Sequence, residues 1–424
     1  EENPMKKFLA LVLAMLMVFS LCACGNGGDS SDSGKKIAYV LCETGDTYSQ
    51  GLGTYFRDAF ESNGGKVIFE SFPKDTSDFT SYLVKATQEN ADVIFAPNST
   101  TVAALLLQQA ADKGIDIPIL AGDTWESSVI LDGVKGTDLK VYCSTFFDEN
   151  DTSGPASAFV KGFKEYLNAD SVRLTNNGGN DIVAAVSALG FDAYNTAYAA
   201  IEAALNAKGG SITSVDVAKA LWEVNITDAV TGTIKFNQTG DAIKDSAYIK
   251  QAGDGAFSFV KVQSVENNDT QGTPVDYKDT GIALDGNTIK IGVYEPQSGN
   301  NGPGGKQEVL GIQYANSLKP SITVNGVEYK IELDIQDNGS DDTTGKTAAA
   351  KLVSDKCLVV LGSYGSGVSI AAADTFAAAA VPAIGCSCTN PQVTDGKDYY
   401  FRICFLDPFQ GSVMAGFAKE LIGG

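Results

Sequence analysis

Two loops rich in glycine, serine and cysteine follow apolar runs near the C-terminal end of the 424-residue chain. They are Gly362–Gly367 (GSYGSG) and Cys386–Pro391 (CSCTNP). A helical pattern at Val368–Ala380 follows the first loop. The backbone N–H groups of the loop, at the start of this helix, and the Ser366 hydroxyl would form an anion site suited to a carboxylate. The alternative is a glycine-rich turn in which a serine caps the helix. Because ligands of open α/β sheets bind at the carboxyl ends of strands, we expect Ser366 and Thr389 to converge.

A second set of polar residues follows predicted strands in the N-terminal part of the chain. Asp123 comes directly after an apolar run at 117–121 and lies next to Trp125. A carboxylate at such a position can hold an ammonium group, although an Asp that caps the next helix is at least as common. Tyr48 and Ser99 follow two other predicted strands. Two sheets that face each other at these edges would enclose a ligand between them.

Several kinds of chemistry are excluded by residue type and spacing. The chain has no histidine, which removes His-dependent triads and His-ligated metal sites. Gly339–Thr347 (GSDDTTGKT) has one residue too many for a phosphate-binding P-loop. Cys386 and Cys388 form a CxC pair with no second cysteine pair beside it, so zinc is not expected. The sequence predicts a binding protein rather than an enzyme, with no metal and no cofactor.

The charge balance bears on possible partners. The chain has 31 basic and 52 acidic side chains and a formal net charge of −21. Because such an acidic chain is repelled by phosphate backbones, nucleic acid is not an expected partner.

The N-terminus has the plan of an export signal. Met5-Lys6-Lys7 precedes an apolar run at 8–21 that is too short to span a bilayer. The run ends in LCACG, which resembles a bacterial lipobox with cleavage before Cys24 and lipid on its thiol. The alternative is a simple secretory signal with incidental cysteines. A Gly/Ser/Asp-rich tether at 25–34 follows.

Strands and helices alternate in two stretches, which predicts α/β architecture with parallel sheets. The first stretch, 35–150, has predicted strands near 36–41, 66–72, 93–95 and 117–121. The second, 289–424, has them near 289–294, 329–336, 357–361 and 381–385. Between the two stretches we expect helices at 151–227, antiparallel strands at 228–264, the first of them Val230–Phe236, and a polar linker at 265–288.

The order of motifs resembles the branched-chain amino-acid-binding proteins of ABC importers. IKIGVYEPQSG, VVLGSYGSG and AVPAIGCSCTNPQVT resemble lobe one of that family, and KIAYVLCETGDTYSQGL, ADVIFAPNSTT and IPILAGDTWES resemble lobe two. The resemblance implies two Rossmann-like lobes joined by a hinge, the type I periplasmic binding protein fold. It covers nearly all of residues 35–424. In the family, lobe one precedes lobe two, so this chain has the order of a circular permutation, of a rearranged gene model or of a remnant of two tandem genes.

The resemblance also implies a site. It places the α-carboxylate of an amino acid on Ser366 and on the segment Ser387, Cys388 and Thr389. It places the α-ammonium on the Ser387 carbonyl, Thr389 and Asp123. The remaining expected ligand-binding residues are Tyr48, Ser99, Tyr364 and, less securely, Phe191.

The function implied is that of a monomeric lipoprotein outside the cytoplasm, anchored to the bacterial cell membrane through Cys24. It would capture an amino acid, of branched-chain type, by closure of the lobes and deliver it to ABC permease subunits. The alternatives are another small polar ligand, such as an amide, a urea-like solute or an aromatic acid, or a ligand-sensing module for a receptor.

Overall fold

The computed structural model describes residues 35–151, 154–265, 267 and 269–423. The predicted signal segment, Cys24 and the tether at 25–34 lie outside these residues. Contacts divide the chain into Glu1–Lys35 and Lys36–Gly424, and the fold below belongs to the second unit. Among the described residues, no helix combines the length and apolar character that a membrane span requires.

The first sheet is built mainly from the N-terminal stretch. Its spatial order is β2-β1-β3-β4-β5-β6-β7; β1 to β5 run parallel, and the β6–β7 hairpin adds to β5 antiparallel. The strands are β1 (Ile37–Glu43), β2 (Lys66–Phe72), β3 (Val93–Phe95), β4 (Ile119–Ala121), β5 (Val141–Thr145), β6 (Ser246–Ala252) and β7 (Phe257–Ser264).

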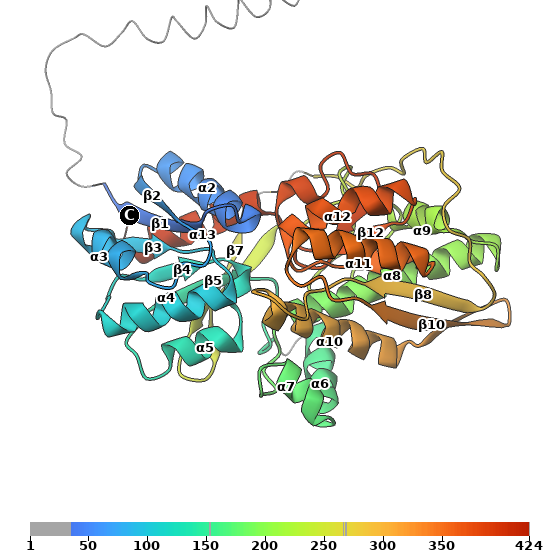
Figure 1. Cartoon of the computed structure of the whole chain (residues 1–424), viewed down its shortest axis with the longest axis horizontal. Coiled ribbons are helices and arrows are strands. Elements are labelled where there is room, and N and C mark those ends of the chain that lie inside the picture. Colours follow the sequence, from blue (N-terminus) through green and yellow to red (C-terminus); the bar gives the residue numbers. More distant parts are fainter. Residues whose placement is uncertain (1–34, 152–153, 266, 268, 424) are drawn as a thin grey trace, which may run out of the picture. The chain divides into compact units, whose positions relative to one another are not determined.

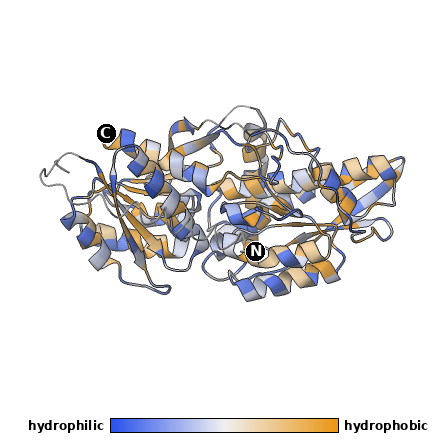
Figure 2. Cartoon of the chain, turned by 90° about the horizontal axis from the view of Figure 1, so that it is seen from above, coloured by the Kyte–Doolittle hydropathy of each residue, from blue (hydrophilic) through white to orange (hydrophobic). Residues whose placement is uncertain are grey.

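Helices cover both faces of this sheet because β1 is apolar on both sides. Val40 packs with Leu52 on one face, whereas Tyr39 packs with Leu106 on the other. Figure 2 shows this pattern as apolar strands inside helices whose outer faces are more hydrophilic. The helices of this lobe are α2 (Thr47–Ser62), α3 (Thr80–Gln88), α4 (Thr100–Asp112), α5 (Ser128–Val134), the short η1 (Asp123–Trp125) and α13 (Asp407–Leu421).

The second sheet is built from the C-terminal stretch. Its order is β13-β12-β11-β8-β10-β9, parallel except for the β9–β10 hairpin. The strands are β8 (Thr288–Val293), β9 (Ser321–Val324), β10 (Val327–Ile335), β11 (Val359–Leu361), β12 (Ala383–Gly385) and β13 (Tyr400–Arg402). The helices of this lobe are α8 (Ala185–Lys208), α9 (Ser214–Leu221), α10 (Gly302–Leu318), α11 (Asp342–Ser354) and α12 (Ser366–Ala378). Helix α6 (Gly154–Asn168) and the short α7 (Ser171–Asn176) and η2 (Pro391–Val393) complete the described fold.

The long helices α8 and α10 pack at unusually close range, and a glycine makes this contact fit. A Cβ at Gly311 would lie 1.9 Å from the Ser187 carbonyl oxygen. This packing attaches α8, which lies between β5 and β6 of the first sheet in the chain, to the second sheet.

We call the first sheet with α2 to α5 and α13 the N-terminal lobe, and the second with α8 to α12 the C-terminal lobe. The expected division gave all of 289–424 to one lobe, but α13, which ends that stretch, packs on α2 and contacts β4 and β5 (Figure 1). Tyr277, in the expected linker, is bonded to the rest of the fold. Trp222 Nε1 donates to the Tyr277 hydroxyl at 3.0 Å, and that hydroxyl donates to the Asp398 carbonyl at 2.6 Å.

One predicted strand was wrong. Val230–Phe236 forms no strand and contributes only isolated bridges at Ile234 and Phe236. The predicted fold class is confirmed: both sheets are mainly parallel, and antiparallel strands lie within 228–264 as expected. Helix α2 begins at Thr47, because the Asp46 carboxylate accepts a hydrogen bond from Ser49 N at 2.6 Å and caps the helix there.

Candidate functional site

A cavity of about 490 Å³ lies where the carboxyl ends of strands from both sheets meet. Among the predicted site residues, the cavity is lined by Tyr48, Ser99, Tyr364, Ser366 and Ser387. The fold therefore brings together, in one cavity, loops that are about 300 residues apart in the chain.

Three predicted residues do not line this cavity: Asp123, Cys388 and Thr389. Asp123 lies directly behind the lining and contacts it through Tyr48. Cys388 packs in the hydrophobic core of the C-terminal lobe. Thr389 is buried, and its carbonyl accepts a hydrogen bond from Asp407 N at 2.9 Å.

Phe191 lies elsewhere. It lines a separate cavity of about 510 Å³ together with Phe159 and Tyr314. Its ring packs against theirs at centroid distances of 4.8 and 5.6 Å. The aromatic character of that cavity reflects core packing between α6, α8 and α10, and it contains none of the polar residues predicted to bind a ligand.

The C-terminal lobe supplies Ser366, the first residue of α12. Its side chain is buried, and its Oγ accepts a hydrogen bond from Asn390 N at 3.3 Å. This bond ties the two predicted loops together and leaves the hydroxyl proton free to donate. Next to the backbone N–H groups at the start of a 13-residue helix, that proton can meet a carboxylate.

The Ser366→Ala variant should bind a carboxylate ligand about 10- to 100-fold more weakly, because a hydrogen bond to a charged group contributes about 1.5–3 kcal/mol. Calorimetric titration of the purified variant would measure this loss. Ser412→Ala, an exposed serine on α13, is the matched control and should bind as the wild type does. Equal affinity of the Ser366→Ala variant and the wild type would remove Ser366 from the site.

Two buried glutamates support the C-terminal-lobe loops from behind. Glu308 on α10 accepts a hydrogen bond from the Ser387 hydroxyl, and Glu295 after β8 accepts one from Tyr364 N at 2.7 Å. Each carboxyl group keeps one oxygen without a partner among the described residues. Burial raises the pKa of Glu295 to about 8 and raises the pKa of Glu308 well above its ordinary value. The two carboxyl groups also interact with each other. We infer that the pair holds at least one proton near neutral pH.

The Cys386 thiol completes a buried trio with this pair. The ligand atoms of Glu295, Glu308 and Cys386 all lie within 4.8 Å of one another. Two carboxylates and a thiolate are a set that a divalent transition metal can accept. Burial raises the pKa of the Cys386 thiol well above its ordinary value, so a metal ion would have to displace the thiol proton in order to bind there.

The Glu308→Gln variant should be more stable than the wild type at pH 8, by about 1–3 kcal/mol, and the gain should shrink toward pH 5. An acid whose pKa is higher in the folded state than in the unfolded state releases its extra proton on unfolding. The free energy of unfolding therefore falls as pH rises, by about 1.4 kcal/mol per pH unit for one proton. Glutamine can still accept from Ser387 and can donate its amide proton to Glu295.

Urea denaturation at pH 5, 7 and 8 would measure this pH dependence. The exposed Glu223→Gln is the control and should follow the wild type at each pH. A Glu308→Gln variant that loses stability equally at every pH would show that the pair does not hold a proton near neutral pH.

The N-terminal lobe supplies Asp123, in η1 directly after β4. Its Oδ1 accepts hydrogen bonds from Gln410 Nε2 at 2.9 Å and from the Tyr48 hydroxyl at 3.2 Å. Its Oδ2 is buried and has no partner among the described residues. Burial raises the pKa of Asp123 to about 6, although the bonds from Gln410 and Tyr48 oppose this shift. A carboxylate held in this way has unused capacity for a positively charged group.

The mouth of the cavity is bridged by hydrogen bonds between the lobes. Thr101 Oγ1 donates to the Asn300 carbonyl at 3.2 Å, and Asn390 Nδ2 donates to the Thr47 carbonyl at 3.3 Å. The lobes therefore contact each other at two points next to residues of the lining, which helps to enclose a small molecule.

Sequence reasoning missed the acidic residues of the lining. They are Glu43, Asp46, Asp341 and Asp342, and Lys74 is the one basic residue beside them in the described lining. Asp46 and Asp341 also cap α2 and α11. Their local pattern indicates only a cap, so their shared position in the cavity depends on the fold.

Two α/β lobes with a polar cavity between the ends of their strands define a two-lobed ligand-binding protein. The sequence model of the periplasmic binding proteins matches residues 27–256 and 288–424. The chain belongs to the periplasmic binding protein family.

Individual relatives match over shorter stretches. The chain is 33% identical over 127 residues to the Leu/Ile/Val-binding protein homolog 1 of Brucella abortus, a match that covers 30% of this chain and 34% of the relative. It is 35% identical over 137 residues to an amino acid binding protein of Pseudomonas aeruginosa, covering 32% and 36% of the two chains. The chain thus spans about a third of the length of these curated relatives. A solved leucine binding protein from Thermotoga maritima has 25% identity and a TM-score of 0.44, with 54% of this chain and 61% of that chain covered.

Proposed function

We propose that the chain is a solute-binding lipoprotein of an ABC importer that captures an amino acid between its two lobes. One observation carries this proposal: the cavity is lined by Ser366 at the start of α12 on one side and by Tyr48, bonded to Asp123, on the other. A zwitterion has opposite charges close together and fits these two walls. The relatives are named as proteins that bind leucine, isoleucine and valine or amino acids in general, and these names support an amino acid as the ligand.

Capture proceeds by closure of the lobes around the ligand. The start of α12 and the Ser366 hydroxyl hold the carboxylate, and Asp123 draws the other lobe onto the ammonium. A ligand stabilises the closed form only to the extent that it makes contacts there that it lacks in the open form. Contact with both lobes provides that difference, and the protein performs no reaction on its ligand.

The remaining parts of the proposal follow from the family and from the N-terminal residues. Members of this family lie outside the cytoplasm, and a lipid on Cys24 would hold this chain, as a monomer, at the bacterial cell membrane. ABC permease subunits would receive the ligand from the closed form. We also propose that the order of the lobes is a natural circular permutation, which the attachment of α13 to the N-terminal lobe supports.

A thermal melt of the purified chain against a panel of L-amino acids tests the proposal. Leucine, isoleucine and valine come first, and urea and short amides are controls. A ligand at 100 times its dissociation constant adds about 2.7 kcal/mol, which raises the melting temperature by a few degrees. A cooperative melt that no amino acid shifts would contradict the proposed ligand, and the absence of a cooperative melt would contradict the permuted order.

A further inference from the structure

The cavity lining is poorly suited to a branched aliphatic side chain. Val368 is the one aliphatic residue in the described lining, and the two aromatic residues are Tyr48 and Tyr364. The rest are glycines and polar or charged residues. Burial of a leucine-sized side chain against such a wall removes little apolar surface from water.

The charge of the lining is negative. Four acids and one base contribute to it, and Glu43 is itself nearly buried. Near the mouth, Asp341 and Asp342 are exposed at the start of α11, and Asp46 lies opposite at the start of α2. A neutral zwitterion needs one negative group for its ammonium, so the cavity has more negative charge than such a ligand requires.

Three further acids lie behind the wall: Asp123, Glu295 and Glu308, all fully or nearly fully buried. Besides burial, the charge of each raises the pKa of the hydroxyl of Tyr364, a residue that lines the cavity. Among the groups that act most strongly on these three carboxyl groups there is no lysine or arginine. Of these three acids, Asp123 is the one that ionises near neutral pH, and its buried Oδ2 has no partner among the described residues. A cation next to Tyr48 and Tyr364 would pair with this carboxylate and could also face the two rings.

We propose that the ligand carries a net positive charge, as an amino acid with a cationic side chain does. The α-carboxylate lies at the start of α12, and the cationic side chain lies among the acids of the lining. This inference rests on the proposed function for the carboxylate and adds the chemical class of the side chain.

Calorimetric titrations of the full chain at low ionic strength with matched ligands test the charge directly. L-arginine should bind at least 10-fold more tightly than L-citrulline, its neutral isostere, and L-lysine should bind more tightly than L-norleucine. If L-citrulline, L-norleucine or L-leucine binds as tightly as the cationic probes, the inference is overturned and the proposed amino-acid function stands. If agmatine or cadaverine, which lack the carboxylate, binds as tightly as the amino acids, the cationic class stands and the amino-acid function falls. If no probe binds, both fall.

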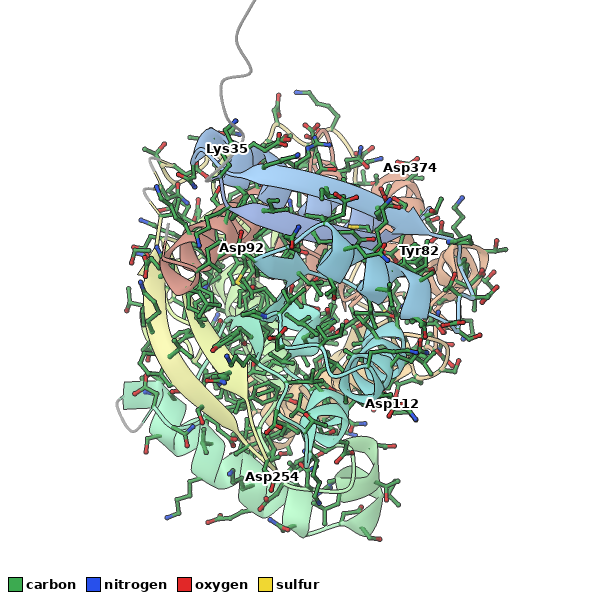
Figure 3. All side chains as sticks on the ribbon, turned by 90° about the vertical axis from the view of Figure 1, so that its left-hand side faces the viewer. Lys35, Tyr82, Asp92, Asp112, Asp254 and Asp374 are labelled. Atoms are coloured by element: carbon green, nitrogen blue, oxygen red, sulfur yellow. The ribbon has the colours of Figure 1, made fainter. Side chains whose placement is uncertain are left out.

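Variants of the lining provide a second readout. The pair Glu43→Gln and Asp342→Asn removes two negative charges from the lining. This double variant should weaken the binding of arginine or lysine about 10-fold and leave the neutral isosteres unchanged. Asp254→Asn, at the tip of the β6–β7 hairpin, is the matched control and should bind as the wild type does (Figure 3). Equal weakening of charged and neutral ligands by the double variant would overturn the inference.

Discussion

The Asp123→Ala variant should lose about 2–5 kcal/mol of binding free energy, which is about 30-fold to several-thousand-fold in affinity. Asp123 is 2% exposed, so an ammonium that reaches its carboxylate is withdrawn from water. Without the carboxylate that charge has no buried partner, and the lost contact is worth far more than an exposed ion pair. Calorimetric titration with the amino acid that produces the largest thermal shift would measure the loss.

The pH dependence of binding separates the charge of Asp123 from its packing. Its pKa of about 6 means that the carboxyl group is largely protonated at pH 5 and largely ionised at pH 7. The wild type should therefore bind an ammonium up to about 10-fold more tightly at pH 7 than at pH 5. The Asp123→Asn variant keeps the size of the side chain and should lack most of this rise in affinity. The neighbouring acids Glu126, Glu308 and Asp407 titrate in both proteins, so their effect is common to the two. Unchanged affinity in the Asp123→Ala variant would remove this residue from the site.

The Arg402→Met variant should destabilise the fold by about 3–5 kcal/mol, because it leaves a buried carboxylate without its charge partner. Arg402 is fully buried at the end of β13, and its Nε donates to Asp241 Oδ1 at 2.5 Å. Its Nη1 donates to the carbonyls of Cys388 at 2.8 Å and Asn390 at 2.5 Å. The guanidinium therefore holds both the buried Asp241 and the loop that carries Ser387. Chemical denaturation measures the loss.

A double-mutant cycle identifies the cause. Arg402→Met combined with Asp241→Leu removes both charges, and such apolar replacements are often neutral or stabilising, so much of the loss should be recovered. Arg57→Ala breaks an exposed pair with Asp58 and should change stability by less than about 1 kcal/mol. A loss below about 1 kcal/mol for Arg402→Met alone would show that the buried pair is not what holds this loop.

The predicted elements with strong apolar periodicity match the structure closely. The strands at 66–72 and 93–95 have the bounds that the sequence indicates. The three-residue β13 was missed because it carries Arg402. From the sequence alone a charged residue is expected at the surface, and only the fold shows that Asp241 lies beside Arg402 as its buried partner. Helix α13 was missed because its small residues give little helical pattern, although it packs firmly on α2.

The candidate site was predictable where its residues follow strands. Ser366, Ser387 and Tyr48 lie at strand ends, and parallel strands bring their carboxyl ends to one edge. The pair of Glu295 and Glu308 was not predictable, because a loop glutamate and a helical one, 13 positions apart, read as two solvated charges. The contact between them depends on how α10 packs against the second sheet.

Capture of one amino acid between two lobes is the central claim, and titration calorimetry of one ligand against three proteins tests it most directly. The proteins are the wild type, Ser366→Ala from the C-terminal lobe and Asp123→Ala from the N-terminal lobe. We predict one site per chain in the wild type and weaker binding in both variants, each still folded in a thermal melt. If either variant binds the ligand with the affinity of the wild type, capture between the lobes is contradicted.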